Sequence, residues 1–434
     1  MPSFDLIVIG AGWAGINASL RAAKLGLKVA LIERDLLGGV CLNLGCIPTK
    51  ALIHSAKIYL SCLKSPQFGI NLENIKVDFK AIQQRKNTVI DRLYKGIEFL
   101  IKSRANITYI KGNARLISPQ EVSLDGKNLK ANYIILATGS KPQDLPFLKF
   151  DGRRILSSDD VLRLDYIPKS ILIVGGGVIG CEFASLFNML KAEVTIVEIL
   201  ERILPQEDIE VSKKLETVFK KRGIKIYTST DIRNIDVNDY QIILVCIGRK
   251  PDTSGLGLEE LGINLDRSRV ITDEYLKTNI PNIYAIGDCT NKLMLAYLAS
   301  HQGHLVVDNI LFPERKLKIY EENVPSCIFT YPEVSRVGLT EQKAKELKLD
   351  IRIDRFDFLG LGMAHIMGET DGFIKIISDR KDGLILGASI LGGVATEMIG
   401  ILTLAIQNKL KIKDLESTIF AHPSFSESIL EALR

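Results

Sequence analysis

The sequence has no long apolar run, no block of like charges and no dense set of cysteines, and each absence excludes a class of protein. A membrane span needs about 18–20 consecutive apolar residues. The best candidates, ILIVGGGVIGC (171–181) and MIGILTLAI (398–406), are interrupted by glycines or too short. The net charge of +5 is small for 434 residues. We therefore expect no membrane segment and no nucleic-acid partner.

The seven cysteines are an odd number and lie scattered apart from one pair, which excludes the disulfide framework of a small secreted protein. The run FDLIVIG (4–10) reads as a strand and leaves no room before it for a cleavable signal sequence. The composition, 46% hydrophobic and 25% charged, is that of an ordinary globular protein. We expect a cytoplasmic protein with about two to four domains.

One motif occurs twice. Residues 4–34 read as a strand, a Gly-x-Gly-x-x-Gly turn, a helix and a second strand that ends in an acid, and residues 170–198 repeat this order. The glycines permit a tight turn and the approach of a pyrophosphate, the helix N-terminus offers N–H groups, and the acid reaches ribose hydroxyls. The residues concerned are Gly10, Gly12, Gly15 and Glu33 in the first copy, and Gly175, Gly177, Gly180 and Glu198 in the second.

Two such units predict two bound dinucleotides. In both copies the acid follows the third glycine by 18 residues, a spacing that packing glycines alone do not require. A protein that holds two dinucleotides most simply passes electrons between a flavin and a nicotinamide. Glu198 favours NAD, because its carboxylate repels the 2′-phosphate of NADP, although Arg202 stands nearby.

Three further strand-like runs end in glycine. YIILATGS (133–140) and IILVCIGRKPDT (242–253) each close a nucleotide-binding half, and NIYAIGDCT (282–290) ends in Gly-Asp. An acid at the carboxyl end of a strand faces the cofactor crevice of an open α/β sheet. Asp288 is therefore a candidate ligand of a flavin hydroxyl, with a plain turn residue as the alternative.

The segment LGGVCLNLGCIPTK (37–50) holds Cys41 and Cys46, which can form a structural disulfide, half of a metal site or a redox pair. A metal site needs further ligands that this segment lacks, and a disulfide across so short a loop adds only about 2 kcal/mol. Cys46 opens an expected helix, whose N-terminus and Lys50 both favour a thiolate. We favour a redox pair that exchanges with a substrate dithiol and lies against a flavin, which Gly39 lets approach.

Several blocks of this sequence resemble the flavoprotein disulfide reductases, and most closely the dihydrolipoamide dehydrogenases. They follow the family's order: GGVCLNLGCIPTKAL, LATGS, GGGVIGCEFAS, GRKPDT, IGDC, MLAYLASHQG, VPSCIFTYPEVSRVG and AHPSFSE. The resemblance implies that protein-bound dihydrolipoamide is oxidised by NAD⁺ through FAD and a Cys41–Cys46 disulfide. It implies a homodimer that serves the lipoylated domains of a 2-oxo-acid dehydrogenase or a glycine cleavage system, and no metal.

The resemblance also implies roles for single residues. Cys41 corresponds to the thiol that exchanges with the lipoyl sulfur, and Cys46 to the thiol that lies against the flavin. Lys50 corresponds to a lysine near the flavin ring, paired with Glu182. The cofactor-binding residues implied in addition to the two repeated units are Gly39, Lys50, Thr138, Gly139, Ser140, Asp288, Ala296, Gly248 and Arg249.

The last block, AHPSFSE, holds a histidine and an acid five residues apart. Taken alone, a histidine beside a proline is ambiguous, although its pKa range suits thiol chemistry near neutral pH. By resemblance, His422 is the acid/base for the substrate dithiol, supplied by the partner subunit, and Glu427 orients it.

Four features depart from the family's pattern. Phe420 and Tyr297 stand where relatives often have histidines, and Trp13 is bulky for a glycine loop. Between the runs 223–230 and 240–248 only nine residues remain, where relatives carry a longer β-meander.

We predict an α/β fold with two Rossmann-like dinucleotide-binding domains and a C-terminal α+β dimerisation domain. An FAD-binding domain (1–142 and 262–320) encloses an NAD-binding domain with a shortened meander (143–261), and the dimerisation domain spans 321–434. One alternative is another FAD-dependent NAD(P)H reductase of a disulfide or metal ion, which the intact cysteine block opposes. The other is a non-catalytic assembly subunit, which the retained His422 opposes.

Overall fold

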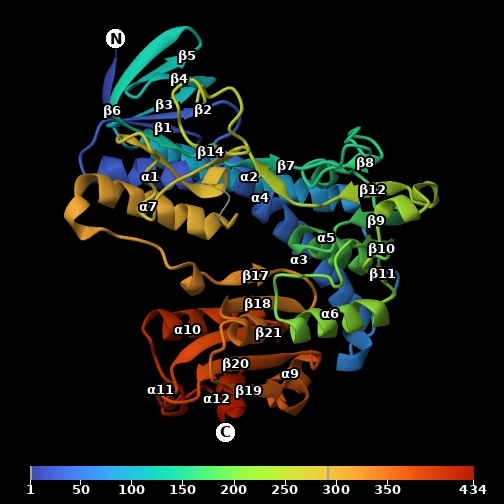
Figure 1. The fold of residues 1–434 in the computed structure, drawn as a ribbon. Coiled ribbons are helices and arrows are strands. Elements are labelled where there is room, and N and C mark those ends of the chain that lie inside the picture. Colours follow the sequence, from blue (N-terminus) through green and yellow to red (C-terminus); the bar gives the residue numbers. More distant parts are fainter. Residues whose placement is uncertain (1, 291–292) are drawn as a thin grey trace.

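The computed structural model describes residues 2–290 and 293–434 and contains three main sheets, each with its own helices (Figure 1). The N-terminal sheet lies at the top of Figure 1, a second sheet at the right and the C-terminal sheet at the bottom. In the described part of the chain, no helix is both long and apolar enough to cross a membrane. The predicted α/β fold with a C-terminal α+β unit is confirmed.

The N-terminal sheet has the strand order β3-β2-β1-β6-β5-β4, with β16 beside β6. Its central strands are buried apolar runs, as expected for parallel strands covered on both faces. Leu6 and Val8 pack toward α1 and α7, whereas Ile7 and Ile9 pack toward the β4–β5 hairpin. The elements are β1 (Ser3–Ile9), α1 (Trp13–Lys24), β2 (Val29–Glu33), α2 (Gly39–Asn43), α3 (Cys46–Lys64), α4 (Phe79–Lys102), β3 (Ile107–Lys111), β4 (Ala114–Ser118), β5 (Glu121–Leu124), β6 (Lys127–Leu136), β16 (Ile283–Ala285) and α7 (Ala296–Leu311).

The second sheet is wholly parallel, with the order β11-β10-β9-β12-β8. Two short antiparallel pairs, β7–β13 and β14–β15, accompany the connections between the N-terminal sheet and the second sheet. The elements are β7 (Ser140–Pro142), β8 (Ile155–Leu156), β9 (Ser170–Val174), α5 (Val178–Met189), β10 (Glu193–Val197), α6 (Ile209–Lys221), β11 (Lys225–Tyr227), β12 (Ile242–Val245), β13 (Arg249–Pro251), β14 (Leu265–Asp266) and β15 (Arg269–Val270).

The short connection between β11 and β12 forms two turns of 3₁₀-helix, Ile232–Asn234 and Val237–Asp239, in place of a meander. Ile232 is buried among the side chains of β9 and β12, so this segment still covers the apolar face of the sheet. The Arg154 guanidinium donates to the carbonyls of Val237 and Tyr240 and ties the segment down. The trimmed region is therefore packed rather than left open.

The C-terminal sheet is antiparallel, with the order β17-β18-β21-β20-β19. It joins the second sheet's unit through Lys375, which is 2% exposed and lies 3.1 Å from Asp208 and 2.5 Å from Glu341. The elements are β17 (Ser326–Ile328), β18 (Glu333–Gly338), α8 (Glu341–Glu346), β19 (Ile351–Asp357), α9 (Gly362–Met367), β20 (Phe373–Asp379), β21 (Ile385–Gly392), α10 (Ala395–Gln407), α11 (Ile412–Glu416) and α12 (Glu427–Leu433).

Candidate redox site and nucleotide-binding loops

The two glycine loops have the same backbone geometry. Gly10 and Gly175 have φ values of +104° and +109°, a region that side chains disfavour. A Cβ at Gly10 would lie 2.3 Å from the carbonyl oxygen of Ala137, and one at Gly175 would lie 2.5 Å from that of Cys246. A Cβ at Gly15 or Gly180 would lie 1.9 or 2.0 Å from the carbonyl oxygen of the first glycine. Glycine is therefore required at all four positions.

The two strand-end acids also make the same contacts. Glu33 Oε2 accepts a hydrogen bond from the Ala11 N–H at 2.6 Å, and Glu198 Oε2 accepts one from the Gly176 N–H at 2.6 Å. In each case Oε1 accepts from the N–H two residues further along the chain, at 2.8 Å. Each acid is thereby fixed beside its glycine loop, where a ribose would lie.

Several features of these loops fit bound dinucleotides. Gly12 and Gly177 precede α1 and α5, and since neither has a side chain, the helix N–H groups stay free for a pyrophosphate. Gly39 has φ +56°, and a Cβ there would lie 2.7 Å from Cα of Gly12, so two glycines meet where a flat cofactor would need close approach. Thr138 Oγ1 is buried with no partner among the described residues, and Ala296 opens α7.

The redox pair lies where α2 is followed by α3: Cys41 is in α2, and Cys46 is the first residue of α3. Both are free thiols. The interaction between the two thiols lowers the pKa of Cys46 to about 7, with help from the charge of Lys50, and raises the pKa of Cys41. The indole N–H of Trp13, buried without a hydrogen-bond partner among the described residues, lowers the pKa of Cys41 in part and so favours its thiolate. Cys46 is thus the thiol that ionises first.

Lys50 and Glu182, two residues predicted from the sequence, form an ion pair. Lys50 Nζ lies 2.8 and 2.7 Å from the two oxygens of Glu182, whose side chain is only 5% exposed. Glu182 Oε1 also accepts the backbone N–H of Phe329 at 2.9 Å, and the Phe329 ring lies beneath the Lys50 ammonium, 4.7 Å away. Phe329 was not predicted, because a backbone N–H leaves no signal in a sequence.

A second predicted group links the ends of three strands. Ser140 Oγ donates to Asp288 Oδ2 at 2.6 Å, and Arg249 Nε donates to Ser140 Oγ at 2.9 Å. Burial raises the pKa of Asp288. Gly139 and Gly248, which precede Ser140 and Arg249, have φ values of +73° and +117°, so both turns depend on glycine.

Sequence reasoning missed a charged cluster beside this group. Asp252 is buried between Arg34, which binds its Oδ2, and Lys141, whose Nζ lies 2.8 Å from its Oδ1. Asp252 belongs to the quoted GRKPDT block, which was the available signal. The cluster connects Arg34, the residue after Glu33, to Asp252, which directly follows β13.

His422 and Glu427 are in contact, but they lie far from the cysteines of the same chain. His422 Nδ1 is 2.7 Å from Glu427 Oε1, and the histidine side chain is 79% exposed. The helix α12, which begins at Glu427, lies at the bottom of Figure 1, with the C-terminal sheet between it and α2. One chain therefore does not bring His422 to Cys41.

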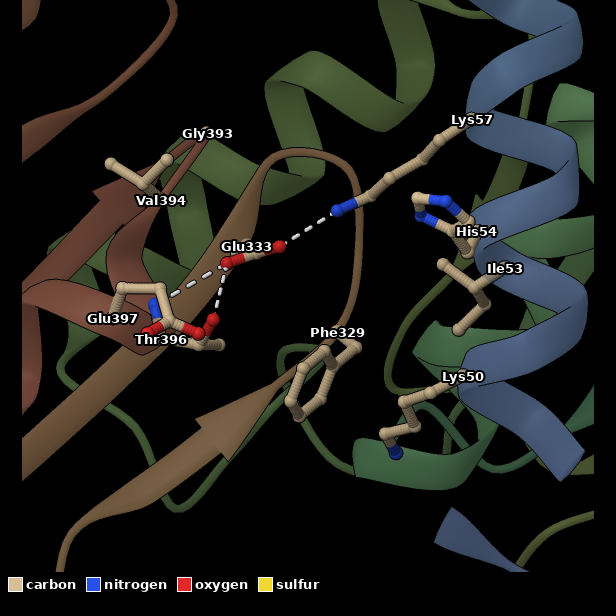
Figure 2. A pocket seen from close by; sticks show the side chains of 10 residues that line it. All are labelled: Lys50, Ile53, His54, Lys57, Phe329, Glu333, Gly393, Val394, Thr396 and Glu397. Carbon is tan, nitrogen blue, oxygen red and sulfur yellow. Dashed lines mark hydrogen bonds and ion pairs between the residues drawn. The ribbon is translucent and has the colours of Figure 1, made fainter. Parts of the chain in front are cut away.

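A cavity of about 250 Å³ lies between α3 and the C-terminal unit (Figure 2). Lys50 is one of its lining residues, and the cavity was not predicted from the sequence. The remaining lining residues are Ile53, His54 and Lys57 on α3, and Phe329, Glu333, Gly393, Val394, Thr396 and Glu397 on the C-terminal side.

Comparison with known proteins gives matches over the whole chain. Family models described as pyridine nucleotide-disulphide oxidoreductase and as the dimerisation domain of that family match residues 4–303 and 324–433. A dihydrolipoyl dehydrogenase of Chlamydia pneumoniae is 43% identical, covering 98% of this chain and 95% of the relative. One of Bacillus subtilis is 38% identical, covering 99% and 97%.

Solved structures agree. LpdA from Mycobacterium tuberculosis superposes with a TM-score of 0.91 at 29% identity, covering 100% of this chain and 99% of LpdA. The Cu(II) complex of the HOCl-induced flavoprotein disulfide reductase RclA from Escherichia coli gives 0.90 at 31% identity, with the same coverage. The chain thus shares its complete architecture with these proteins.

Proposed function

The chain belongs to the pyridine nucleotide-disulphide oxidoreductase family, and from this premise we propose that it is a cytoplasmic dihydrolipoyl dehydrogenase that oxidises protein-bound dihydrolipoamide with NAD⁺. The observation that carries the proposal is the Cys41–Cys46 pair at the start of α3, with a low pKa at Cys46 and the Lys50–Glu182 ion pair one turn along. The lipoyl substrate is supported by curated relatives of that name at 43% and 38% identity.

The thiol chemistry follows from the difference between the two cysteines. A thiolate of the substrate attacks Cys41 of the oxidised pair and expels Cys46, which leaves readily because its pKa is low. The second substrate thiolate then attacks the mixed disulfide and expels Cys41. The substrate leaves as a cyclic disulfide, and the cysteine pair has gained two electrons.

The proposed acid/base is His422 of the partner subunit. The matching dimerisation-domain model supports a homodimer, and the exposed histidine needs a second chain to reach a cysteine pair. Its Nδ1 is held by Glu427, so Nε2 is the nitrogen that takes the proton from the substrate thiol. The dithiol gives up two protons through this histidine; overall, one is consumed when the electron pair becomes a hydride and the other is released to solvent.

The two loops provide the proposed cofactor sites. The loop of Gly10 and Glu33, with Gly39 and the Ser140–Asp288 group, would hold FAD, and the loop of Gly175 and Glu198 would hold NAD. FAD, when bound, supplies the step that turns the electron pair of the dithiol into a hydride for NAD⁺. We assign 1–142 with 262–320 to FAD, 143–261 to NAD and 321–434 to dimerisation.

A preference for NAD over NADP is supported by Glu198 and by the position of Arg202. The Glu198 carboxylate occupies the place where a 2′-phosphate would need a cation. In the sequence, the nearby Arg202 counted against this preference, because a cation there could bind a 2′-phosphate. In the structure it donates instead to the carbonyl of Pro205 at 2.8 Å. Its guanidinium is therefore bound within its own loop.

The first experiment is an anaerobic titration of the flavin-loaded protein with dihydrolipoamide and then with NAD⁺, followed by absorbance. A long-wavelength band at two electrons that NAD⁺ discharges, with formation of NADH, supports the proposal. A flavin that ignores dihydrolipoamide but bleaches with NADH or NADPH contradicts it. That result would favour a reductase of another disulfide or of a metal ion, an alternative that the similarity to RclA supports. A protein that binds lipoylated domains without turnover would be an assembly subunit.

A further inference from the structure

Three lysines recur every seven residues along α3, at Lys50, Lys57 and Lys64. Seven residues are close to two turns of an α-helix, so the three side chains share one face. Each binds a residue outside the helix: Lys50 binds Glu182, Lys57 binds Glu333 at 2.7 Å, and Lys64 donates to the Tyr331 hydroxyl at 3.1 Å. The helix that begins with Cys46 is therefore tied down at three points along its length.

The middle one of these contacts, between Lys57 and Glu333, forms part of the cavity wall (Figure 2). The Glu333 side chain is 10% exposed, and its second oxygen accepts the Thr396 hydroxyl at 2.7 Å and the Thr396 N–H at 3.3 Å. Thr396 lies in the first turn of α10, so this carboxylate also sits at a helix N-terminus, which favours its charge. Lys57 thus connects α3 to both β18 and α10.

The position of α3 matters because its first turn carries the redox chemistry. Cys46, Lys50 and Lys57 lie on the same helix, α3. A small rotation of this helix at Lys57 would change the distance and orientation between the Cys41 and Cys46 thiols. Lys57 is 11 residues from Cys46, or about 16 Å along the axis. At this distance, and with its charge neutralised by Glu333 2.7 Å away, Lys57 has little direct electrostatic effect on the thiol.

We propose that Lys57, acting through Glu333, is a positioning residue that holds the redox end of α3 in place. The inference rests on the proposed function in one respect, that Cys46 is the thiol that ionises. Lys57 lies two turns beyond Lys50, where the C-terminal unit contacts α3. The proposal adds it to the residues that control the reactivity of Cys41 and Cys46.

The test compares three variants of the full-length, flavin-loaded protein after reduction. K57M removes the tie, K57R keeps the charge and the donor, and K375M removes a buried lysine elsewhere as a control for lost stability. Alkylation by iodoacetamide is followed at each cysteine peptide by mass spectrometry from pH 5 to pH 10, beside thermal unfolding.

We expect K57M to raise the pKa of Cys46 by about one unit, which at pH 7 lowers its thiolate fraction, and hence its alkylation rate, about fivefold. K57R should restore the unaltered profile. K375M should lower the unfolding midpoint and leave the Cys46 profile unchanged. NADH turnover with ferricyanide, which needs no dithiol, should persist in K57M.

An unchanged Cys46 profile in K57M, whatever happens to its unfolding midpoint, would overturn the inference, because Lys57 would then be structural only. If K57M fails to fold, E333Q serves in its place, since it keeps the shape and the contact with Thr396 but removes the ion pair; an unchanged profile there overturns the inference equally. A Cys46 of ordinary pKa in the unaltered protein would instead overturn the proposed function, which keeps the two failures distinct.

Discussion

Nδ1 of His422 lies 2.7 Å from Oε1 of Glu427, and the other oxygen of that carboxylate accepts the Ser424 N–H at 2.6 Å. These two hydrogen bonds, that of His422 first, lower the pKa of Glu427. An ionised carboxylate fixes the orientation of the imidazole, which leaves Nε2 to exchange a proton with a thiol.

Replacing Glu427 by glutamine keeps the size of the side chain but removes the charged acceptor that holds Nδ1 of His422. We expect kcat for dihydrolipoamide oxidation to fall about tenfold to a hundredfold, with ferricyanide reduction by NADH unchanged. Steady-state kinetics of both reactions measure this. E431Q, which alters a partly exposed acid on the same helix that pairs with Arg434, is the matched control and should behave as the unaltered protein. Equal kinetics for the two variants would remove Glu427 from the mechanism.

Replacing Cys46 by serine should abolish thiol exchange. We expect dihydrolipoamide oxidation to fall by about a thousandfold or more, because no other group can take the place of the leaving thiolate. C62S, a change of the same kind further along α3, should retain full activity. Anaerobic titration should show flavin reduction by NADH in both variants. Residual dihydrolipoamide turnover in C46S would mean that the pair is misassigned.

The low pKa of Cys46 predicts a pH dependence. The reduced protein should lose its Cys46 thiolate as the pH falls through about 7. Because the folded-state pKa lies below the ordinary value of 9.0, the thiolate contributes stability that is fully present above about pH 9 and is lost as the pH falls through about 7. Alkylation rates of Cys46 against pH give the midpoint, and K50M should move it upward. A midpoint near 9 in the unaltered protein would contradict the assignment.

Glutamine at position 198 should weaken the discrimination between NAD and NADP. Loss of a buried charged acceptor is worth about 1.5–3 kcal/mol, so we expect the ratio of kcat/KM values for the two cofactors to change about tenfold to a hundredfold. E33Q is the same substitution at the matching place in the other loop. It should leave that ratio unaltered and reduce flavin retention, measured as bound flavin after dialysis. Exchanged outcomes would mean that the two loops are assigned the wrong way round.

Phenylalanine at position 13 should slow the exchange at Cys41. The buried Trp13 N–H has no hydrogen-bond partner among the described residues and favours the Cys41 thiolate. A hydrogen bond formed to that thiolate would be worth about 0.5–1.5 kcal/mol, or about two- to tenfold in rate. Stopped-flow reduction by dihydrolipoamide tests this. Trp13 is the only tryptophan in the chain, so its emission in the unaltered protein should also change when the pair is reduced. An unchanged reduction rate would leave Trp13 as a packing residue.

The repeated units were predictable because all their information lies within short stretches of sequence. Buried strand, glycine turn, helix and terminal acid follow one another in about 30 residues, and the structure repeats the hydrogen bonds of Glu33 and Glu198 atom for atom. The Lys50–Glu182 pair was predictable only through resemblance, since 132 residues separate its members.

Other contacts had no local signal. Lys57 and Glu333 are 276 residues apart, and their pairing depends on how the C-terminal sheet docks on α3. The direction of Arg202 toward Pro205 depends on loop geometry rather than on residue type. The packing of Ile232 over the second sheet could not be predicted either, because the sequence of a short apolar segment does not indicate which surface it will cover.

The separation of α12 from α2 along the molecule has a genetic consequence. If each centre takes its thiols from one chain and its imidazole from the other, two defective copies of the gene can compensate for one another. A chain without Cys41 and a chain without His422 would form a hybrid in which one centre has lost both groups and the other has lost neither. Co-expression of two inactive alleles should then yield active enzyme.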